Sequence, residues 1–157
     1  MSLRRTLSRQ ASLVGALLLP LLGGACGPER LEKTEQDLRN AIAAAVSRGD
    51  TATLRLFIEV PFAFDSVYIA GPYTPVDTLA ARLGDAWHPE FSRGIETDDR
   101  FHLFVFKVQD QLVPAALPRE SAVVAPELTG RMYGPESAVF RVQRGPGAAA
   151  PSLLPLE

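Results

Sequence analysis

The side chains that most often carry out chemistry are few in this 157-residue chain. It has two histidines, His88 and His102, and one cysteine, Cys26. The histidines stand on different predicted elements and no cysteine lies near them, so they form a poor ligand set for zinc or another transition metal. We expect His102, close to the start of an apolar strand, to be a hydrogen-bonded structural residue. The sequence therefore predicts neither a metal nor a cofactor.

An acidic run, GIETDDR, carries Glu96, Asp98 and Asp99. Carboxylate oxygens bind calcium, but the spacing differs from that of an EF-hand loop, and a solvated loop or strand-entry turn is the simpler interpretation. No serine stands in a glycine-flanked elbow of the kind that presents a hydrolase nucleophile. We therefore predict no catalytic residue, and enzyme activity is left open without being favoured.

The first 25 residues have the pattern of a bacterial export signal. Arg4, Arg5 and Arg9 precede an uncharged, leucine-rich run over residues 11–22, and small residues follow up to Cys26. That run is shorter than the roughly 20 apolar residues that a membrane-spanning helix needs, and it contains a proline. We expect this segment to be removed. Export could use either the general secretory or the twin-arginine route.

The stretch LLGGA directly before Cys26 resembles the lipobox of bacterial lipoproteins. The resemblance implies acylation of the Cys26 thiol, cleavage before Cys26 and acylation of the new amino group, palmitate being a typical chain. Gly23 departs from the pattern, which prefers Leu, Val or Ile at that place. The alternative is an ordinary secretory cut near Ala25. Because Gly27, not aspartate, follows Cys26, the resemblance favours the periplasmic face of the outer membrane.

The charge of the remaining chain excludes some partners. Residues 26–157 carry 13 basic and 18 acidic side chains, which gives no basic surface for nucleic acid or an anionic membrane. Their number suits one domain with one core. We divide the chain into a signal peptide (1–25), a short tether (26–30), a single α+β domain (31–143) and a disordered tail (144–157).

Hydrophobic periodicity predicts the elements of that domain. Apolar residues recur every three or four positions over residues 31–49, which is typical of an amphipathic helix. Alternating or continuous apolar runs predict strands, with FHLFVFKV at the sheet centre and a proline-containing edge partner after it; these runs cover residues 53–60, 65–70, 101–108, 111–117 and 137–142. Residues 120–131 fit a short helix or a loop. The predicted fold is α+β, with the N-terminal helix and an antiparallel sheet of about four or five strands.

The turn GPYTPVD predicts a short capped helix between the second and third strands. Thr74 suits the N-cap, Pro75 the first helical position, and Asp77 the third position of a capping box. A strand, a glycine and a helix start can also cradle a phosphate. Because Thr74 would occupy part of the amides and Asp77 would repel an anion, we prefer the structural interpretation.

This part of the chain also resembles a known group of proteins. Phe64-Asp65, the run from Val67 to Ile69 and the turn from Gly71 to Thr74 match a D-x-V-Y-I-x-x-P-Y-T motif. The motif resembles one in small bacterial lipoproteins and secreted proteins of unknown function. Phe64 stands where a tryptophan is usual in that group. The resemblance implies that strand, turn and helix form one unit, and it implies no activity.

Tyr73 and Trp87, on either side of the short helix, are candidate interface anchors or caps of the core. We expect a lipid-anchored envelope protein that offers a non-catalytic domain to an envelope protein partner. One alternative is an enzyme or small-ligand receptor that uses Tyr73, His88 or His102 between sheet and helix. Another is an inhibitor or immunity-type protein with an exposed acidic stripe from Glu96 to Asp99.

Overall fold

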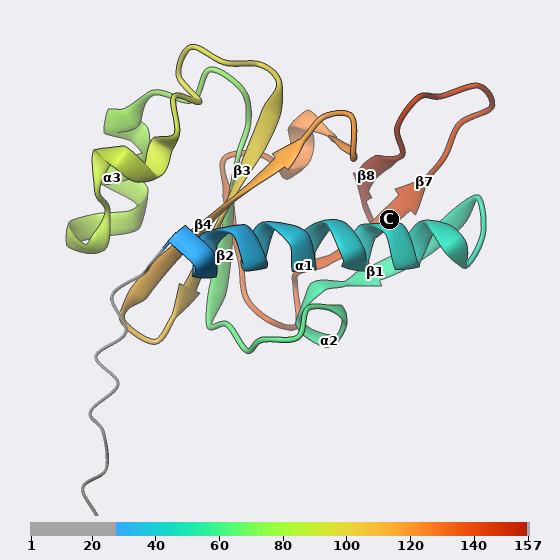
Figure 1. The fold of residues 1–157 in the computed structure, drawn as a ribbon, viewed down its shortest axis with the longest axis horizontal. Helices are drawn as coiled ribbons and strands as arrows, with labels where there is room; N and C mark the ends of the chain where they lie inside the picture. The colour runs from blue at the N-terminus through green and yellow to red at the C-terminus, as the bar shows by residue number, and fades with distance from the viewer. Residues whose placement is uncertain (1–27, 157) are drawn as a thin grey trace, which may run out of the picture.

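The computed structural model describes residues 28–156, which form an α+β fold with two four-stranded sheets and few helices. Figure 1 shows the order of the elements along the chain. The helices are α1 (Pro28–Ser47), α2 (Leu56–Glu59) and α3 (Val76–Leu83), with three short 3₁₀ turns at Gly84–Ala86, Pro89–Ser92 and Pro126–Leu128. No helix within residues 28–156 is long and apolar enough to cross a membrane.

The first sheet has the order β4-β3-β2-β6 and is antiparallel throughout. Its strands are β2 (Ser66–Ala70), β3 (Phe101–Val108), β4 (Gln111–Pro118) and β6 (Arg131–Tyr133). The prediction for β3 is confirmed in both its bounds and its central place. Pro114 lies in β4, an edge strand, because proline offers no N–H to a second neighbour.

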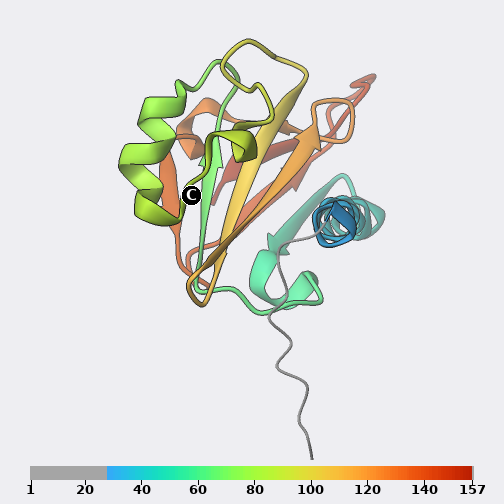
Figure 2. The same ribbon diagram turned by 60° about the vertical axis from the view of Figure 1, so that its left-hand side comes forward.

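Both faces of this sheet are covered at β3, which explains why this strand is apolar at almost every position. Phe104 and Phe106 point into the main core together with residues of α1 and the second sheet. Leu103 and Val105 point to the other face, where Leu79 of α3, Trp87 and Ile95 cover them. In Figure 2, α1 and α3 lie on opposite sides of the strands.

The second sheet has the order β1-β7-β8-β5. Its strands are β1 (Thr51–Arg55), β5 (Val123–Val124), β7 (Val139–Gln143) and β8 (Ser152–Pro155). Three pairings join these strands; β1 with β7 and β7 with β8 are antiparallel, and β5 with β8 is parallel. One face contributes Leu54, Phe140 and Leu153 to the main core, whereas Thr53 and Arg55 on the other face are exposed.

Side chains of α1 and of Arg48, the residue directly after it, contact the outer edges of both sheets. The carboxylate of Glu35 accepts a hydrogen bond from the backbone N–H of Ala116 in β4 (3.2 Å) and pairs with Arg93. The guanidinium of Arg48 donates to the carbonyl of Thr53 in β1 (2.8 Å) and forms two hydrogen bonds with Glu59. These contacts satisfy backbone groups that an edge strand otherwise leaves open.

Two predictions about the sheets are wrong. A single sheet of four or five strands was expected, but residues assigned to it divide between two sheets. The predicted tail over residues 144–157 is also not disordered, since Ser152–Pro155 forms β8 and Leu153 is buried in the core. An interior strand of the second sheet thus comes from a Gly- and Ala-rich segment whose apolar run is too short to indicate a strand alone.

The predicted strand over residues 53–60 is correct only in its first part. After Arg55 the chain turns into α2, where the N–H of Val60 donates to the carbonyl of Leu56 (3.0 Å). Leu56 and Val60 are buried, and in so short a helix the side chains between them face outward. The segment 120–131, left open above, contains β5, a 3₁₀ turn and the start of β6.

The predicted capping box at Thr74 is wrong. The residue before α3 is Pro75, and no side chain caps the helix. Thr74 instead closes the turn before it, because its hydroxyl donates to the carbonyl of Gly71 (2.7 Å) and its N–H donates to the same oxygen (3.3 Å). Thr74 therefore stabilises the turn and not the helix end.

Candidate functional site

A groove of about 1190 Å³ lies where α2, β6 and the end of the second sheet meet. Four separate parts of the chain line it: residues 55–58, Leu128, residues of 131–140, and 155–156. We name it the α2–β6 groove. It is open along one side, and most of the surface that lines it is apolar. A groove of this size and chemistry is the leading candidate for a binding site in the described part of the chain.

The floor of the α2–β6 groove is closely packed. Phe140 and Leu128 are buried, and the ring of Tyr133 packs edge-on against Phe140 with 5.3 Å between the ring centroids. The hydroxyl of Tyr133 donates to the carbonyl of Leu128 (3.0 Å). Burial raises the pKa of Tyr133, and the positive charge of Arg131 opposes that rise. The phenol is thus a neutral hydrogen-bond donor that fixes the floor.

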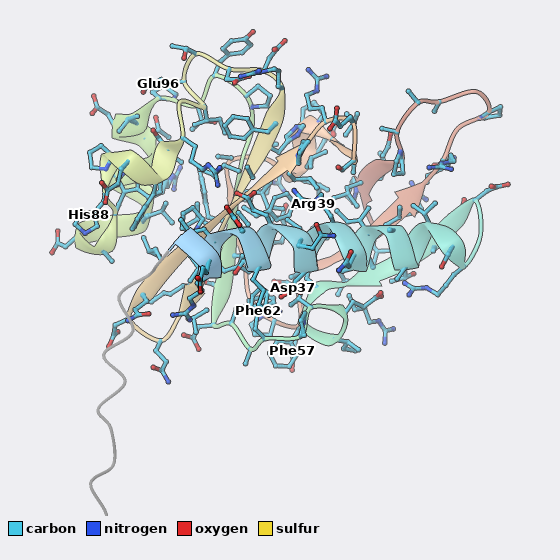
Figure 3. The ribbon with its side chains drawn as sticks, in the orientation of Figure 1. Asp37, Arg39, Phe57, Phe62, His88 and Glu96 are labelled. Atoms are coloured by element: carbon cyan, nitrogen blue, oxygen red, sulfur yellow. The ribbon has the colours of Figure 1, made fainter. Side chains whose placement is uncertain are left out.

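Large apolar side chains form the rim. Phe57 is 46 % exposed, Ile58 70 % and Leu156 48 %. Phe57 is held on one side by an edge-on contact with Phe64, with 5.7 Å between the ring centroids, and Figure 3 shows Phe57 at the lower edge of the molecule. Single exposed apolar residues need no explanation, but a cluster at one groove indicates an interaction surface. Sequence analysis did not identify these residues.

The signal for this rim was present in the sequence but ambiguous. Leu54, Phe57 and Ile58 fit a helical stripe as well as an alternating strand. In a strand, Phe57 and Ile58 would point to opposite faces of the sheet. The strand assignment therefore did not predict that both side chains are exposed. The short helix brings both side chains to the surface. The other lining residues come from segments that only the tertiary fold unites.

The groove carries more positive than negative charge. Arg55 and Arg131 line it, and Glu136 is the carboxylate among its lining residues. Within residues 28–156, the guanidinium groups of Arg55 and Arg131 make no ion pair. This local excess contrasts with the acidic balance of the whole chain. An acidic ligand would therefore find complementary charge here.

The two aromatic residues proposed as interface anchors do not form one patch. Trp87 is 7 % exposed and packs in the cluster that covers the first sheet, edge-on to Phe91. Tyr73 is 61 % exposed. Its backbone adopts a left-handed conformation (φ 62°), and its N–H donates to the carbonyl of Ile95 (2.8 Å). Trp87 is thus a core residue, and Tyr73 stands alone on the turn.

The structure does not bring Tyr73, His88 and His102 together. His102 is 3 % exposed and lies on the β3 face that it shares with Phe104, opposite the face covered by α3. His88 is exposed beside Phe91, and Figure 3 shows it far from Phe57. None of the three residues lines the α2–β6 groove. The enzyme or receptor hypothesis therefore has no common site on these residues.

The Gly71 turn offers little to an anion. The N–H groups of Tyr73 and Thr74 are already bonded to the carbonyls of Ile95 and Gly71. A Cβ at Gly71 would lie 3.3 Å from the side chain of Thr129, a tight contact, so glycine allows a close approach of two chain segments here. The turn is a packed connection.

The acidic run near Glu96 is partly neutralised. Arg100 donates to the carboxylate of Asp98 through its side chain and its backbone N–H, and these hydrogen bonds lower the pKa of Asp98 to about 2. Glu96 is exposed on the loop at the top of Figure 3. No group of three His, Cys, Asp or Glu side chains within residues 28–156 is placed to hold a metal ion. Cys26 lies outside the described residues.

Comparison with known proteins leaves the α2–β6 groove as the basis for assigning function. No protein-family model, no curated protein and no solved structure matches this chain.

Proposed function

We propose that this protein is a lipid-anchored component of the bacterial cell envelope that presents a small, non-catalytic domain to a protein partner in the periplasm. The observation that carries the proposal is the α2–β6 groove, where Phe57, Ile58 and Leu156 remain exposed beside a packed aromatic floor. Clustered apolar side chains next to arginine are the composition that recurs at the energetic centres of protein interfaces.

The membrane anchor is the second part of the proposal. Lipidation at Cys26 would attach the chain by two or three acyl chains, at about 0.8 kcal/mol per buried CH₂. Only Gly27 separates Cys26 from Pro28, the first residue of α1. The amphipathic N-terminal helix expected from the sequence would then begin at the leaflet and hold the domain close to it. We place the anchor in the outer membrane, on its periplasmic face.

Site-specific crosslinking in living cells tests the proposed function. A photoreactive residue at Ile58, on the groove rim, should form protein adducts of discrete mass. The matched control is the same residue at Thr78, which is exposed on α3 outside the groove. Equal adducts from both positions would indicate random encounters. Adducts with phospholipid alone would indicate that the groove contacts the membrane and not a protein partner.

A further inference from the structure

We infer that the α2–β6 groove binds an extended, acidic segment of the partner, which adds as a strand to the open edge of β6. The inference deepens the proposed function and rests on it. It names the conformation and the charge of the segment that is bound.

β6 differs from the other edge strands of the two sheets. The edge of β4 is met by Glu35 of α1 and that of β1 by Arg48, which directly follows α1, and β5 has two residues against three in β6. β6 ends its sheet and pairs with β2 alone. Within residues 28–156 no side chain forms a hydrogen bond with the backbone of Arg131, Met132 or Tyr133. Its outer edge therefore keeps main-chain groups available to another strand.

The groove runs along the same strand. Arg131 and Tyr133 line it, whereas Met132, between them, points to the opposite face of the sheet. A segment paired with β6 would direct every second side chain toward Phe57, Ile58 and the Tyr133 ring. Main-chain hydrogen bonds then supply affinity, and pockets for alternate side chains supply specificity, as in other cases of strand addition.

Charge decides which segment fits. Arg55 and Arg131 have no ion-pair partner within residues 28–156, so a carboxylate of the ligand would be the first to neutralise them. An anionic amphiphile would also satisfy the arginines and the apolar rim. It has no backbone to pair with β6, however, and the groove is open along one side. The combination of an open edge, apolar positions and free arginines favours a peptide segment.

The test uses the full chain carrying Cys26→Ser, purified from the soluble fraction, and three probes. Two pools of ten-residue peptides alternate apolar and polar positions, with Asp and Glu at the polar positions of one pool and Lys in the other. Vesicles of phosphatidylglycerol and phosphatidylethanolamine form the third probe. We expect the acidic pool to bind about tenfold or more tightly than the lysine pool. Amide hydrogen exchange at residues 131–133 should slow when the acidic pool is bound.

Variants assign that binding to the groove. Arg55→Glu combined with Arg131→Glu should reverse the preference between the two pools. Arg82→Glu, a charge reversal on exposed α3, should leave it unchanged. Ile58→Asp places a carboxylate at the groove rim, so the affinity for the acidic pool should fall about tenfold. Because the Ile58 side chain is 70 % exposed, the substitution should not disturb the fold. Melting temperatures of all variants check that each is folded.

Three results would overturn the inference. Equal binding of both pools would show that the groove does not select an acidic segment. Binding with unchanged amide hydrogen exchange at residues 131–133 would show that the peptide does not pair with β6. Binding of vesicles but of neither pool would identify a site for anionic amphiphiles. If Ile58 still forms specific protein adducts in cells, the proposed function stands although this inference fails, whereas an absence of protein adducts removes the proposed function itself.

Discussion

At the scale of single residues, the best-defined titratable group is a buried histidine. His102 is 3 % exposed, and its Nδ1 has no hydrogen-bond partner within the described residues. Burial, and to a smaller extent the positive charge of Arg119, lowers the pKa of His102 to about 4, against 6.5 for an unperturbed imidazole. The folded protein thus holds this imidazole neutral. The sequence predicted a structural, hydrogen-bonded histidine; it is buried, but its ring makes no hydrogen bond within residues 28–156.

This burial predicts a pH dependence of stability. Between pH 6.5 and about 4 the unfolded chain binds a proton at His102 that the folded chain does not, so the free energy of unfolding should fall as the pH falls through this window. His102→Leu should flatten that dependence. Urea midpoints at pH 7 and pH 5, compared between wild type and variant, measure it. Parallel changes in both proteins would assign the effect to carboxylates elsewhere.

At the scale of elements, β8 is the largest departure from what the sequence indicated. It lies between β7 and β5, and its Leu153 packs in the main core with 1 % of its surface exposed. β5 depends on it, because β5 has no other strand partner within the described residues, and β7 pairs with it on the side away from β1. The last residues of the described chain are thus part of the fold.

Leu153→Ala should cost about 2–5 kcal/mol of folding free energy, because it removes buried methyl groups and leaves a cavity. The matched control is Leu154→Ala, one residue further along the same strand and pointing to the less covered face. Its cost should be clearly smaller. Urea denaturation of both variants compares them. If the two substitutions cost the same, β8 does not contribute to the core in the way described here.

Prediction from sequence succeeded where one segment carries its own signal. FHLFVFKV is apolar on both faces, and it forms the central strand with the predicted bounds. PSLLP has two prolines and a run of only two leucines, so its strand depends on β7 and β5 being in place. The α2–β6 groove depends on four distant segments meeting. Periodicity reports what one element buries and not which elements meet.

At the scale of the whole molecule, α1 connects the proposed anchor to the folded domain. It contacts β4 through Glu35, and Arg48, the residue directly after its end, contacts β1, so this part of the chain joins edges of both sheets. In Figure 1 it crosses the molecule in front of the strands. A domain joined to the leaflet through such a helix would have a restricted orientation relative to the membrane.

Cys26→Ser should detach the protein from the membrane. The variant should appear in the soluble periplasmic fraction or remain unprocessed, because no acyl chain can be attached to the hydroxyl by the same route. Intact mass of the wild-type protein is the decisive measurement. A mature chain that begins at Cys26 without added acyl mass would contradict lipidation.

The pairing of β1 with β7 has a consequence for how the chain reaches its native state. Thr51 near the start of the described region pairs with Gln143 near its end, whereas β2, β3 and β4 follow one another along the chain. Closing so long a loop is slow, because its entropy is lost before the distant contacts form. We expect β2, β3 and β4 to associate first. The second sheet can then form only after the C-terminal segment has left the ribosome, and any chaperone that acts on this protein would meet β1 with its partner strand still missing.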